Sequence, residues 1–487
     1  MSHKTFTRRD FLKTGAFTGL AAGTGFLGST AKKVSKKYQH GDAKNVIFLV
    51  SDGMSSGTLA LADLVKQDQY GEKTNWIKLY ESDREYHRGL MDMASLYNPV
   101  TDSAAAASSW GCGHRVINDA VNWGPNNEEY KTVCEIFRDA GKATGLVTTT
   151  RITHATPAGF GANVPARGME DAIADQYAGR QYDVLMGGGN NHFSPDRRRD
   201  GRDLYRTFAN NRYNIVRTKA ELERVRNRGK LLGIFDDSHL PYTIDHHSFP
   251  ELRQTIPTLA EMSKTALERL NRHPNGFILQ IEGGRVDHAA HDNDAASLIY
   301  DQIAFDDAVK VVMDFTENRD DTLVILTTDH GNANPGLGAF GSRYDDSPKR
   351  LRTIQNYRHS FEWLFDQLGY HWSQDTATGQ VTANRIRELI EYATSTIITE
   401  DEAIMALQAF RGEFQAPFRD RQGPAGVLSG IMANYNGIYF ITTTHTSDYV
   451  EIAAWGPGSD RIPTFVRNTY LFDLMVDMAG VRAYAER

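Results

Sequence analysis

The sequence contains very few cysteines, with only Cys112 and Cys134 among 487 residues. Two cysteines exclude a fold held together by disulfides, and we favour two buried free thiols over a bridged pair. The formal net charge is −7, which gives no general affinity for nucleic acid. Beyond the N-terminal region, no apolar run approaches the length of a transmembrane helix. No internal repeat occurs, and the length suffices for one large α/β domain or two smaller ones.

The most informative segment is the ten residues that begin at Glu282, which contain two acids and two imidazoles. They directly follow the apolar run 277–281, which predicts a buried strand with Glu282 at its carboxyl end. Asp287 and His291 are spaced i, i+4, so both lie on one face if this piece is helical. A carboxylate and an imidazole on one face suit Zn²⁺. One such cluster alone is also typical of a solvated acidic turn.

Four further segments repeat this arrangement, each with a β-like apolar run followed by residues that can bind a metal. These residues are Asp52 after 45–50, Asp329 and His330 after 322–326, His445 after 437–441, and, through a short polar stretch, His154 and Thr156 after 142–147. In an open α/β sheet, ligands gather at the carboxyl ends of the strands. The five segments together therefore predict a site for several metal ions.

A candidate nucleophile, Ser103, stands directly before the polyalanine stretch 104–107. Polyalanine strongly favours a helix, so Ser103 lies where that helix would begin, with Asp102 before it. Both residue types are also favoured simply as helix N-caps. The free N–H groups at a helix N-terminus stabilise an anion as well, so capping does not exclude function. No Ser-His-Asp triad is required, because a metal can lower the pKa of the hydroxyl.

These motifs resemble those of the alkaline phosphatases, in the family's order and over nearly the whole chain from Asp52 to Pro457. The stretch Thr101-Asp102-Ser103-Ala104 is similar to the family's nucleophile motif. The resemblance implies an α/β fold with a mostly parallel central sheet flanked by helices. It also implies a catalytic domain over residues 32–487 with a largely helical insertion at about 335–434.

The resemblance implies a site with two Zn²⁺ ions and one Mg²⁺ ion. Arg167, eleven residues past Thr156, falls where the family has its phosphate-clamping arginine, and Asp102 would orient it. The implied ligands are Asp287, His291 and His445 for one Zn²⁺; Asp52, Ser103, Asp329 and His330 for the other; and Asp52, Thr156 and Glu282 for Mg²⁺.

Two positions that vary within the family are both histidine in this chain. His154 stands where some bacterial members have aspartate, and His288 stands where they have lysine. This combination resembles the animal-type version of the site. A histidine removes one negative charge from beside the Mg²⁺ position, which should weaken Mg²⁺ binding and could admit Zn²⁺ or Co²⁺. We expect His288 to contact phosphate through water rather than to bind a metal.

The expected activity is hydrolysis of small phosphate monoesters through a phosphoserine at Ser103. The alternatives are a related superfamily phosphodiesterase or sulfatase, and a non-catalytic metal- or phosphate-binding relative. Sulfatases of this superfamily use a C/S-x-P-x-R motif, which is absent around Ser103. Diesterases usually lack the Mg²⁺ ligands and the arginine that are present here as Glu282, Thr156 and Arg167. The complete ligand set counts against a non-catalytic relative.

Between residues 332 and 434 the strand pattern lapses, and 358–369, 383–395 and 400–411 have helical patterns. The family has a variable insertion here, near the site entrance or the dimer contact, so a homodimer is a further expectation. We expect this segment to determine substrate preference. Residues 191–250 are charged and irregular, and we interpret them as surface.

The N-terminus has a twin-arginine pattern, Arg8-Arg9 within residues 7–13, followed by an apolar stretch over 15–28. That stretch is too short to span a bilayer as a helix, and small residues predict cleavage after Ala31. We therefore interpret residues 1–31 as a twin-arginine signal peptide, with a retained anchor as the alternative. The pattern predicts export by the twin-arginine machinery to the periplasm or the cell exterior. The cleavage site has no cysteine, which argues against a lipid anchor there.

Overall fold

The computed structural model describes residues 39–371, 376–377, 381–416 and 419–485. The predicted signal peptide and its cleavage site lie outside the described residues. Within those ranges, no helix combines the length and apolarity that crossing a membrane requires. Cys112 and Cys134 are both buried free thiols, as the sequence predicted.

Ten strands form one sheet in the order β16-β2-β15-β8-β1-β7-β3-β4-β6-β5. Of these strands, only β15 runs antiparallel to its neighbours, so the predicted mostly parallel central sheet is confirmed. The strands are β1 (Asn45–Ser51), β2 (Tyr86–Asp92), β3 (Ala143–Arg151), β4 (Val184–Gly188), β5 (Tyr213–Val216), β6 (Lys230–Ile234), β7 (Phe277–Gly283), β8 (Thr322–Thr327), β15 (Val450–Trp455) and β16 (Phe465–Arg467).

The central strand β1 explains why its sequence is a continuous apolar run rather than an alternating one. Its side chains point alternately to the two faces of the sheet, and each face is covered by a hydrophobic core. Val46, Phe48 and Val50 belong to one core, whereas Ile47 and Leu49 belong to the other. All residues of β1 are therefore buried.

Helices cover both faces of the sheet. The core that contains Ile47 includes α2 (Ser56–Tyr70), α12 (Leu259–Leu270) and α14 (Ala295–Phe315). The core that contains Phe48 includes α4 (Ser103–Gly111), α5 (Val133–Asp139), α6 (Ala155–Gly161), α7 (Glu170–Arg180), α8 (Leu204–Asn210) and α20 (Tyr470–Met478). Among the described residues, the remaining α-helices outside 335–434 are α3 (Asn75–Glu81), α9 (Lys219–Arg224), α10 (Thr243–Ser248), α11 (Pro250–Thr255), α13 (Arg285–His291) and α21 (Arg482–Ala485).

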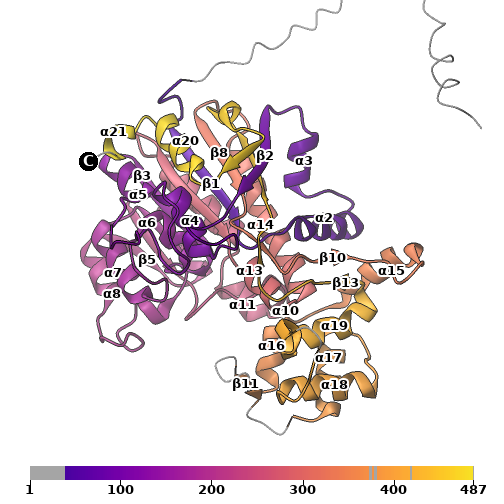
Figure 1. Ribbon diagram of the computed structural model, residues 1–487. Coiled ribbons are helices and arrows are strands. Elements are labelled where there is room, and N and C mark those ends of the chain that lie inside the picture. Colours follow the sequence, from indigo (N-terminus) through magenta and orange to yellow (C-terminus); the bar gives the residue numbers. More distant parts are fainter. Residues whose placement is uncertain (1–38, 372–375, 378–380, 417–418, 486–487) are drawn as a thin grey trace, which may run out of the picture. The chain divides into compact units, whose positions relative to one another are not determined.

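The predicted helical segment between residues 335 and 434 contains five α-helices within its described parts. Four of them, α16 to α19, pack against one another (Figure 1). The short strands β10 (Gly336–Leu337) and β13 (Ile438–Tyr439) pair at the two ends of the segment, and β11 (Tyr370–His371) pairs with β12 (Thr376–Ala377) inside it. The helices are α15 (Ser347–Leu351), α16 (Phe361–Gln367), α17 (Ala383–Thr394), α18 (Glu400–Phe410) and α19 (Pro424–Asn436).

Two interpretations of the sequence were wrong. The run 437–441 does not add a strand to the central sheet, because Gly437 ends α19 in the left-handed region and only Ile438–Tyr439 pairs, with β10. Residues 191–250 are not merely surface, since they contribute β5 and β6 to the sheet. Charged residues flank the short buried core of β6, Leu231–Ile234, and they conceal its strand pattern.

Candidate active site and metal centre

Three adjacent strands of the sheet end side by side and place acidic residues at one edge. Val50 of β1 is in register with Glu282 of β7 and with Thr327 of β8. Asp52 follows β1, and Asp329 with His330 follows β8, so these side chains share one buried region with Glu282. The strand ends therefore meet as the sequence predicted.

Gly53 allows the turn after β1 to approach the opposite wall of the site. Its φ is +66°, and a Cβ at this position would collide with Asp287. Its N–H donates to Asp329 Oδ1 at 2.9 Å, which fixes that carboxylate relative to the turn. A side chain at position 53 would therefore push apart the two sides of the site.

The predicted helix after β7 is present as α13, and it places Asp287 and His291 on one face. His291 Nε2 lies 3.4 Å from Asp287 Oδ2. His445 comes from β14 (His445–Thr446), which pairs with β9 (Gly331–Asn332). Its Nε2 lies 3.5 Å from Asp287 Oδ1 and 3.0 Å from His291 Nε2. These three side chains therefore converge on one point.

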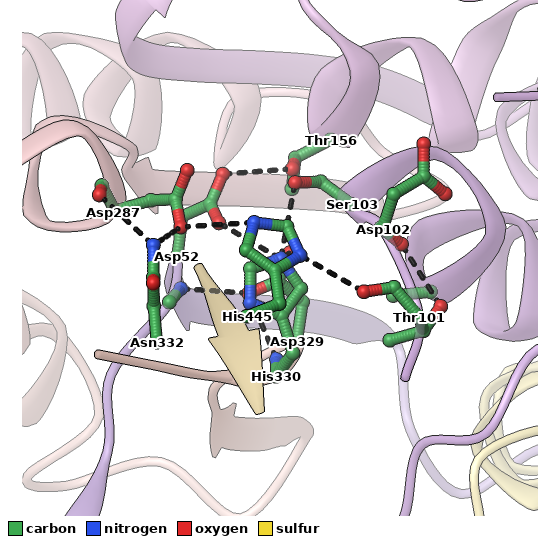
Figure 2. Close-up of polar contacts among 12 residues, drawn as sticks. Asp52, Thr101, Asp102, Ser103, Thr156, Asp287, Asp329, His330, Asn332 and His445 are labelled. Atoms are coloured by element: carbon green, nitrogen blue, oxygen red, sulfur yellow. Dashed lines mark hydrogen bonds and ion pairs between the residues drawn. The ribbon is translucent and has the colours of Figure 1, made fainter. Parts of the chain in front are cut away.

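The second ring nitrogen of two histidines is held by the backbone. His291 Nδ1 donates to Thr443 O at 2.7 Å, and His445 Nδ1 donates to Thr101 O at 2.9 Å (Figure 2). A proton on Nδ1 leaves the Nε2 lone pair of each neutral ring free. This orientation, with a backbone acceptor behind the ring, is typical of histidines that bind a metal.

Three groups of donor atoms in the described residues are compact enough for a metal ion, with all atoms of a group within 4.8 Å of one another. In the first group, His330 lies close to Asp287 and His445, which the sequence analysis had grouped with His291. The third contains His154, which the sequence analysis had placed beside a metal rather than among its ligands. The groups are Asp287 with His330 and His445; Asp52 with Asp329 and His330; and Asp52 with His154 and Glu282.

Several buried atoms in these groups have no hydrogen-bond partner among the described residues. A buried polar atom without a partner is costly, and a buried carboxylate is more so. Bound cations would satisfy these atoms, so the residues present fit metal ions. These atoms include the carboxylate oxygens Asp52 Oδ1 and Glu282 Oε1.

The acids of the site strongly perturb one another. Burial raises the pKa of Asp52 well above its usual range, and the Asp329 carboxylate raises it further. Burial also raises the pKa of Glu282 to about 7. Burial opposes the ionisation of Asp287, but His291 and His445 outweigh it and hold this pKa well below its usual range. Without cations, Asp52 and Glu282 therefore keep their protons to a higher pH than free carboxyl groups do, whereas bound cations would favour the charged forms.

Ser103 is the first residue of α4, as predicted, and its hydroxyl faces the metal-binding groups. Ser103 Oγ lies 3.2 Å from His330 Nε2 (Figure 2). Asp102 is the N-cap and accepts from Ala105 N at 2.9 Å. The free N–H groups of this helix end favour an anion beside Ser103.

Arg167 lies beside the same helix end. Its Nη1 lies 3.2 Å from Asp102 Oδ2, and its Nη2 lies 3.1 Å from His154 Nε2. Asp102 Oδ2 also accepts from Asp119 N at 3.0 Å, which restrains the carboxylate. Asp102 and His154 therefore orient the guanidinium.

Comparison with known proteins gives the same family. The alkaline phosphatase family model matches residues 43–481. The chain belongs to the alkaline phosphatase family. It is 35% identical to alkaline phosphatase 3 of Bacillus subtilis, over 93% of this chain and 92% of that protein. It is 30% identical to alkaline phosphatase 4 of the same organism, over 94% of this chain and 92% of that protein.

The fold agrees with this membership. The crystal structure of Thermus thermophilus alkaline phosphatase superimposes with a TM-score of 0.84 at 32% identity, covering 94% of this chain and 96% of that one. The protein is thus a phosphatase of a metal-dependent hydrolase family, which establishes an enzyme rather than a non-catalytic relative.

Sequence reasoning missed several residues of this alkaline phosphatase site. Thr148 and Thr150 of β3 both donate to Glu282 Oε2. Thr156, which the sequence analysis had assigned to the Mg²⁺ site, does lie there, and its Oγ1 donates to Asp52 Oδ2 at 3.3 Å. The run of three threonines at 148–150 carries a signal, because residues 148 and 150 point to the same face of the strand. Asn332 donates to Asp287 Oδ1 at 2.7 Å.

Two further residues, His239 and Arg285, surround His288. The His288 ring centroid lies 4.3 Å from that of His239 and 5.5 Å from that of His154. Arg285 Nη1 lies 2.8 Å from His288 Nδ1. His239 follows β6 in a loop without a recognisable motif, so no local pattern could have identified it.

Proposed function

We propose that the protein hydrolyses phosphate monoesters through a phosphoserine at Ser103, at a centre for two Zn²⁺ ions and a third divalent cation. The observation that carries the proposal is the position of Ser103 Oγ, 3.2 Å from His330 Nε2 at the start of α4. A hydroxyl at a helix N-terminus and beside a metal ligand is suited to become an oxyanion.

The described residues supply ligands of the types that Zn²⁺ prefers. Bound cations would lower the pKa of the Ser103 hydroxyl and neutralise the charge on the attacking and leaving oxygens. The orientation of the His291 and His445 rings, with Nε2 free, supports this assignment. We assign Asp287, His291 and His445 to one Zn²⁺, and Asp52, Ser103, Asp329 and His330 to the other.

The third cation would be held by Asp52, Thr156 and Glu282, with His154 among its neighbours. His154 places an imidazole ring, rather than a carboxylate, close to the oxygens of Asp52 and Glu282. Mg²⁺ prefers oxygen ligands, whereas imidazole suits Zn²⁺ and Co²⁺. We therefore propose that this position binds Mg²⁺ weakly and also accepts Zn²⁺ or Co²⁺.

The side chains of the protein bind the substrate and form the intermediate. Arg167 offers a planar pair of donors to two phosphoryl oxygens, and Asp102 holds it in that orientation. Ser103 Oγ loses its proton to water and attacks phosphorus, and the bond between phosphorus and the ester oxygen breaks. The departing alkoxide takes up a proton from solvent. Water then attacks phosphorus, the bond between phosphorus and Ser103 Oγ breaks, and Oγ takes up a proton as inorganic phosphate leaves.

The test compares one purified sample on p-nitrophenyl phosphate, bis(p-nitrophenyl) phosphate and p-nitrophenyl sulfate. We expect the monoester to be hydrolysed fastest, and a phosphoserine to be trapped by acid quenching during turnover. Faster hydrolysis of the diester or the sulfate would favour the related superfamily enzymes instead. Monoester turnover without any trapped phosphoserine would contradict covalent catalysis.

We also propose export through the twin-arginine machinery, supported by the Arg8-Arg9 pair. Replacement of both arginines by lysine keeps the charge but removes the pattern. We expect the wild-type chain in the exported fraction, with an N-terminus that begins after Ala31, and the double variant to be retained. Export of the variant at the wild-type level would contradict the proposal.

A further inference from the structure

Arg285 is a buried cation at the start of α13, the helix that carries Asp287 and His291. Only 3% of its surface is exposed. Its Nη2 lies 2.7 Å from Glu362 Oε2 on α16, and its guanidinium carbon lies 3.7 Å from the ring centroid of Tyr242. An ion pair and a cation–π contact therefore hold the guanidinium in one orientation.

The third contact of this guanidinium is with His288. Arg285 Nη1 lies 2.8 Å from His288 Nδ1. A guanidinium has only hydrogen-bond donors and stays charged, so Nδ1 of His288 must accept. A neutral imidazole that accepts through Nδ1 carries its proton on Nε2. His288 therefore presents a donor, and not an acceptor, at its other nitrogen.

His288 lies beside His154, which is the neighbour of the phosphate-binding candidate Arg167. The His288 and His154 rings meet edge to face, with an interplanar angle of 82°. His154 in turn contacts Arg167, whose other nitrogen contacts Asp102 beside Ser103. His288 is partly exposed.

We propose that Arg285 is a positioning residue, which fixes His288 as the Nε2–H tautomer so that His288 donates toward the phosphoryl group, and that Glu362 anchors Arg285. The inference rests on the proposed function, because it assigns the donor to the same phosphate site. It also gives the helical segment, through α16, a contact that reaches the active site.

A double-mutant cycle tests the coupling between the two residues. In His288→Gln, the side-chain amide offers N–H groups near the position of Nε2 and cannot change tautomer. We expect Arg285→Gln to raise the inhibition constant of inorganic phosphate about tenfold in the wild-type background, since it releases one hydrogen bond of the site. In the His288→Gln background, the same change should have less than a twofold effect, with a similar pattern in KM. Equal losses in both backgrounds would show a merely structural role and overturn the proposal.

Arg269 provides a matched control for the loss of a buried guanidinium. It is 6% exposed and donates to the carbonyl oxygens of Arg226, Arg228 and Gly229, away from the site. We expect Arg269→Gln to lower the unfolding temperature but to leave phosphate inhibition unchanged. Glu362→Gln should reproduce the Arg285→Gln phenotype more weakly. A wild-type inhibition constant in Glu362→Gln would contradict the anchoring role.

A second measurement does not depend on activity. Nitrogen-15 labelled histidine reports through its ring resonances which nitrogen carries the proton, and the His288→Gln spectrum assigns the signals of His288. We expect a protonated Nε2 and an unprotonated Nδ1, and a mixture of tautomers in Arg285→Gln. A proton on Nδ1 in the native enzyme would refute the inference even if phosphoserine forms. Conversely, absence of phosphoserine with the expected spectrum would refute only the proposed function.

Discussion

The buried carboxylate of Glu282 offers a quantitative test of why this site requires cations. Its side chain is fully buried, and Oε2 accepts from two threonines, whereas Oε1 has no hydrogen-bond partner among the described residues. Burial raises its pKa from 4.5 to about 7. The perturbation is the substitution Glu282→Gln, which keeps the shape and removes the titratable proton, combined with complete removal of metal.

The sign of the effect follows from the direction of the pKa shift. Because the pKa is higher in the folded state, the metal-free folded protein binds this proton more tightly than the unfolded chain does. The resulting stabilisation is fully present below about pH 4.5 and is lost as the pH rises through about 7. At 1.36 kcal/mol per pKa unit, this interval corresponds to a loss of about 3 kcal/mol in the free energy of unfolding.

The assay is denaturant unfolding of metal-free wild type and metal-free Glu282→Gln between pH 4 and pH 8.5. Subtraction of the variant removes the groups that titrate identically in both proteins. We expect wild type to lose about 3 kcal/mol relative to the variant across this range. With Zn²⁺ and Mg²⁺ restored, wild type should be more stable than Glu282→Gln at pH 8, because the carboxylate then binds a cation. If the free energy of unfolding of metal-free wild type, relative to that of the metal-free variant, stays constant or rises with pH, the reasoning is refuted.

Four further predictions concern metal removal, the nucleophile and the ligands. EDTA should abolish p-nitrophenyl phosphate hydrolysis, and Zn²⁺ with Mg²⁺ should restore it. Ser103→Ala should lose phosphoenzyme formation but keep nearly normal metal content, measured by atomic emission. His154→Asp should raise Mg²⁺ affinity in a titration, since it adds an oxygen donor; unchanged affinity would mean that residue 154 does not border the third cation. Asn332→Ala frees Asp287 Oδ1 and should weaken Zn²⁺ binding about tenfold or more in a competition with a chelating dye, while an unchanged affinity would show that Asn332 does not orient Asp287.

The parts of the site that follow from local patterns could be predicted from the sequence. Asp287 and His291 share a helix face because their spacing matches the helical period, and their side chains do meet. Glu282 and Asp52 could be placed at strand ends because each follows a continuous apolar run, which predicts a strand buried on both faces. These runs and spacings are properties of a few neighbouring residues, which is why they can be read without a structure.

The remaining contacts depend on segments that are distant in the sequence. His445 reaches Asp287 through the pairing of β14 with β9 and not from a strand of the central sheet. His239 and Arg285 acquire their positions only when the loop after β6 and the start of α13 meet around His288. Short strands with charged flanks, such as β6, likewise lack a local pattern strong enough to identify them.

The connections of the helical segment bear on how it can influence catalysis. Its ends are closed by two antiparallel pairs, β10 with β13 and β9 with β14, and the second pair carries His445. These pairs fix the position of His445, the proposed metal ligand, with backbone hydrogen bonds that do not depend on side chains inside the segment. The contact between Glu362 and Arg285 is made by side chains, beside the Phe361 N–H, which donates to Asp294 Oδ2 at 2.7 Å. Variation within the segment should therefore alter phosphate binding through Arg285 and His288 before it alters metal binding, so that changes in substrate preference need not disturb the metal site.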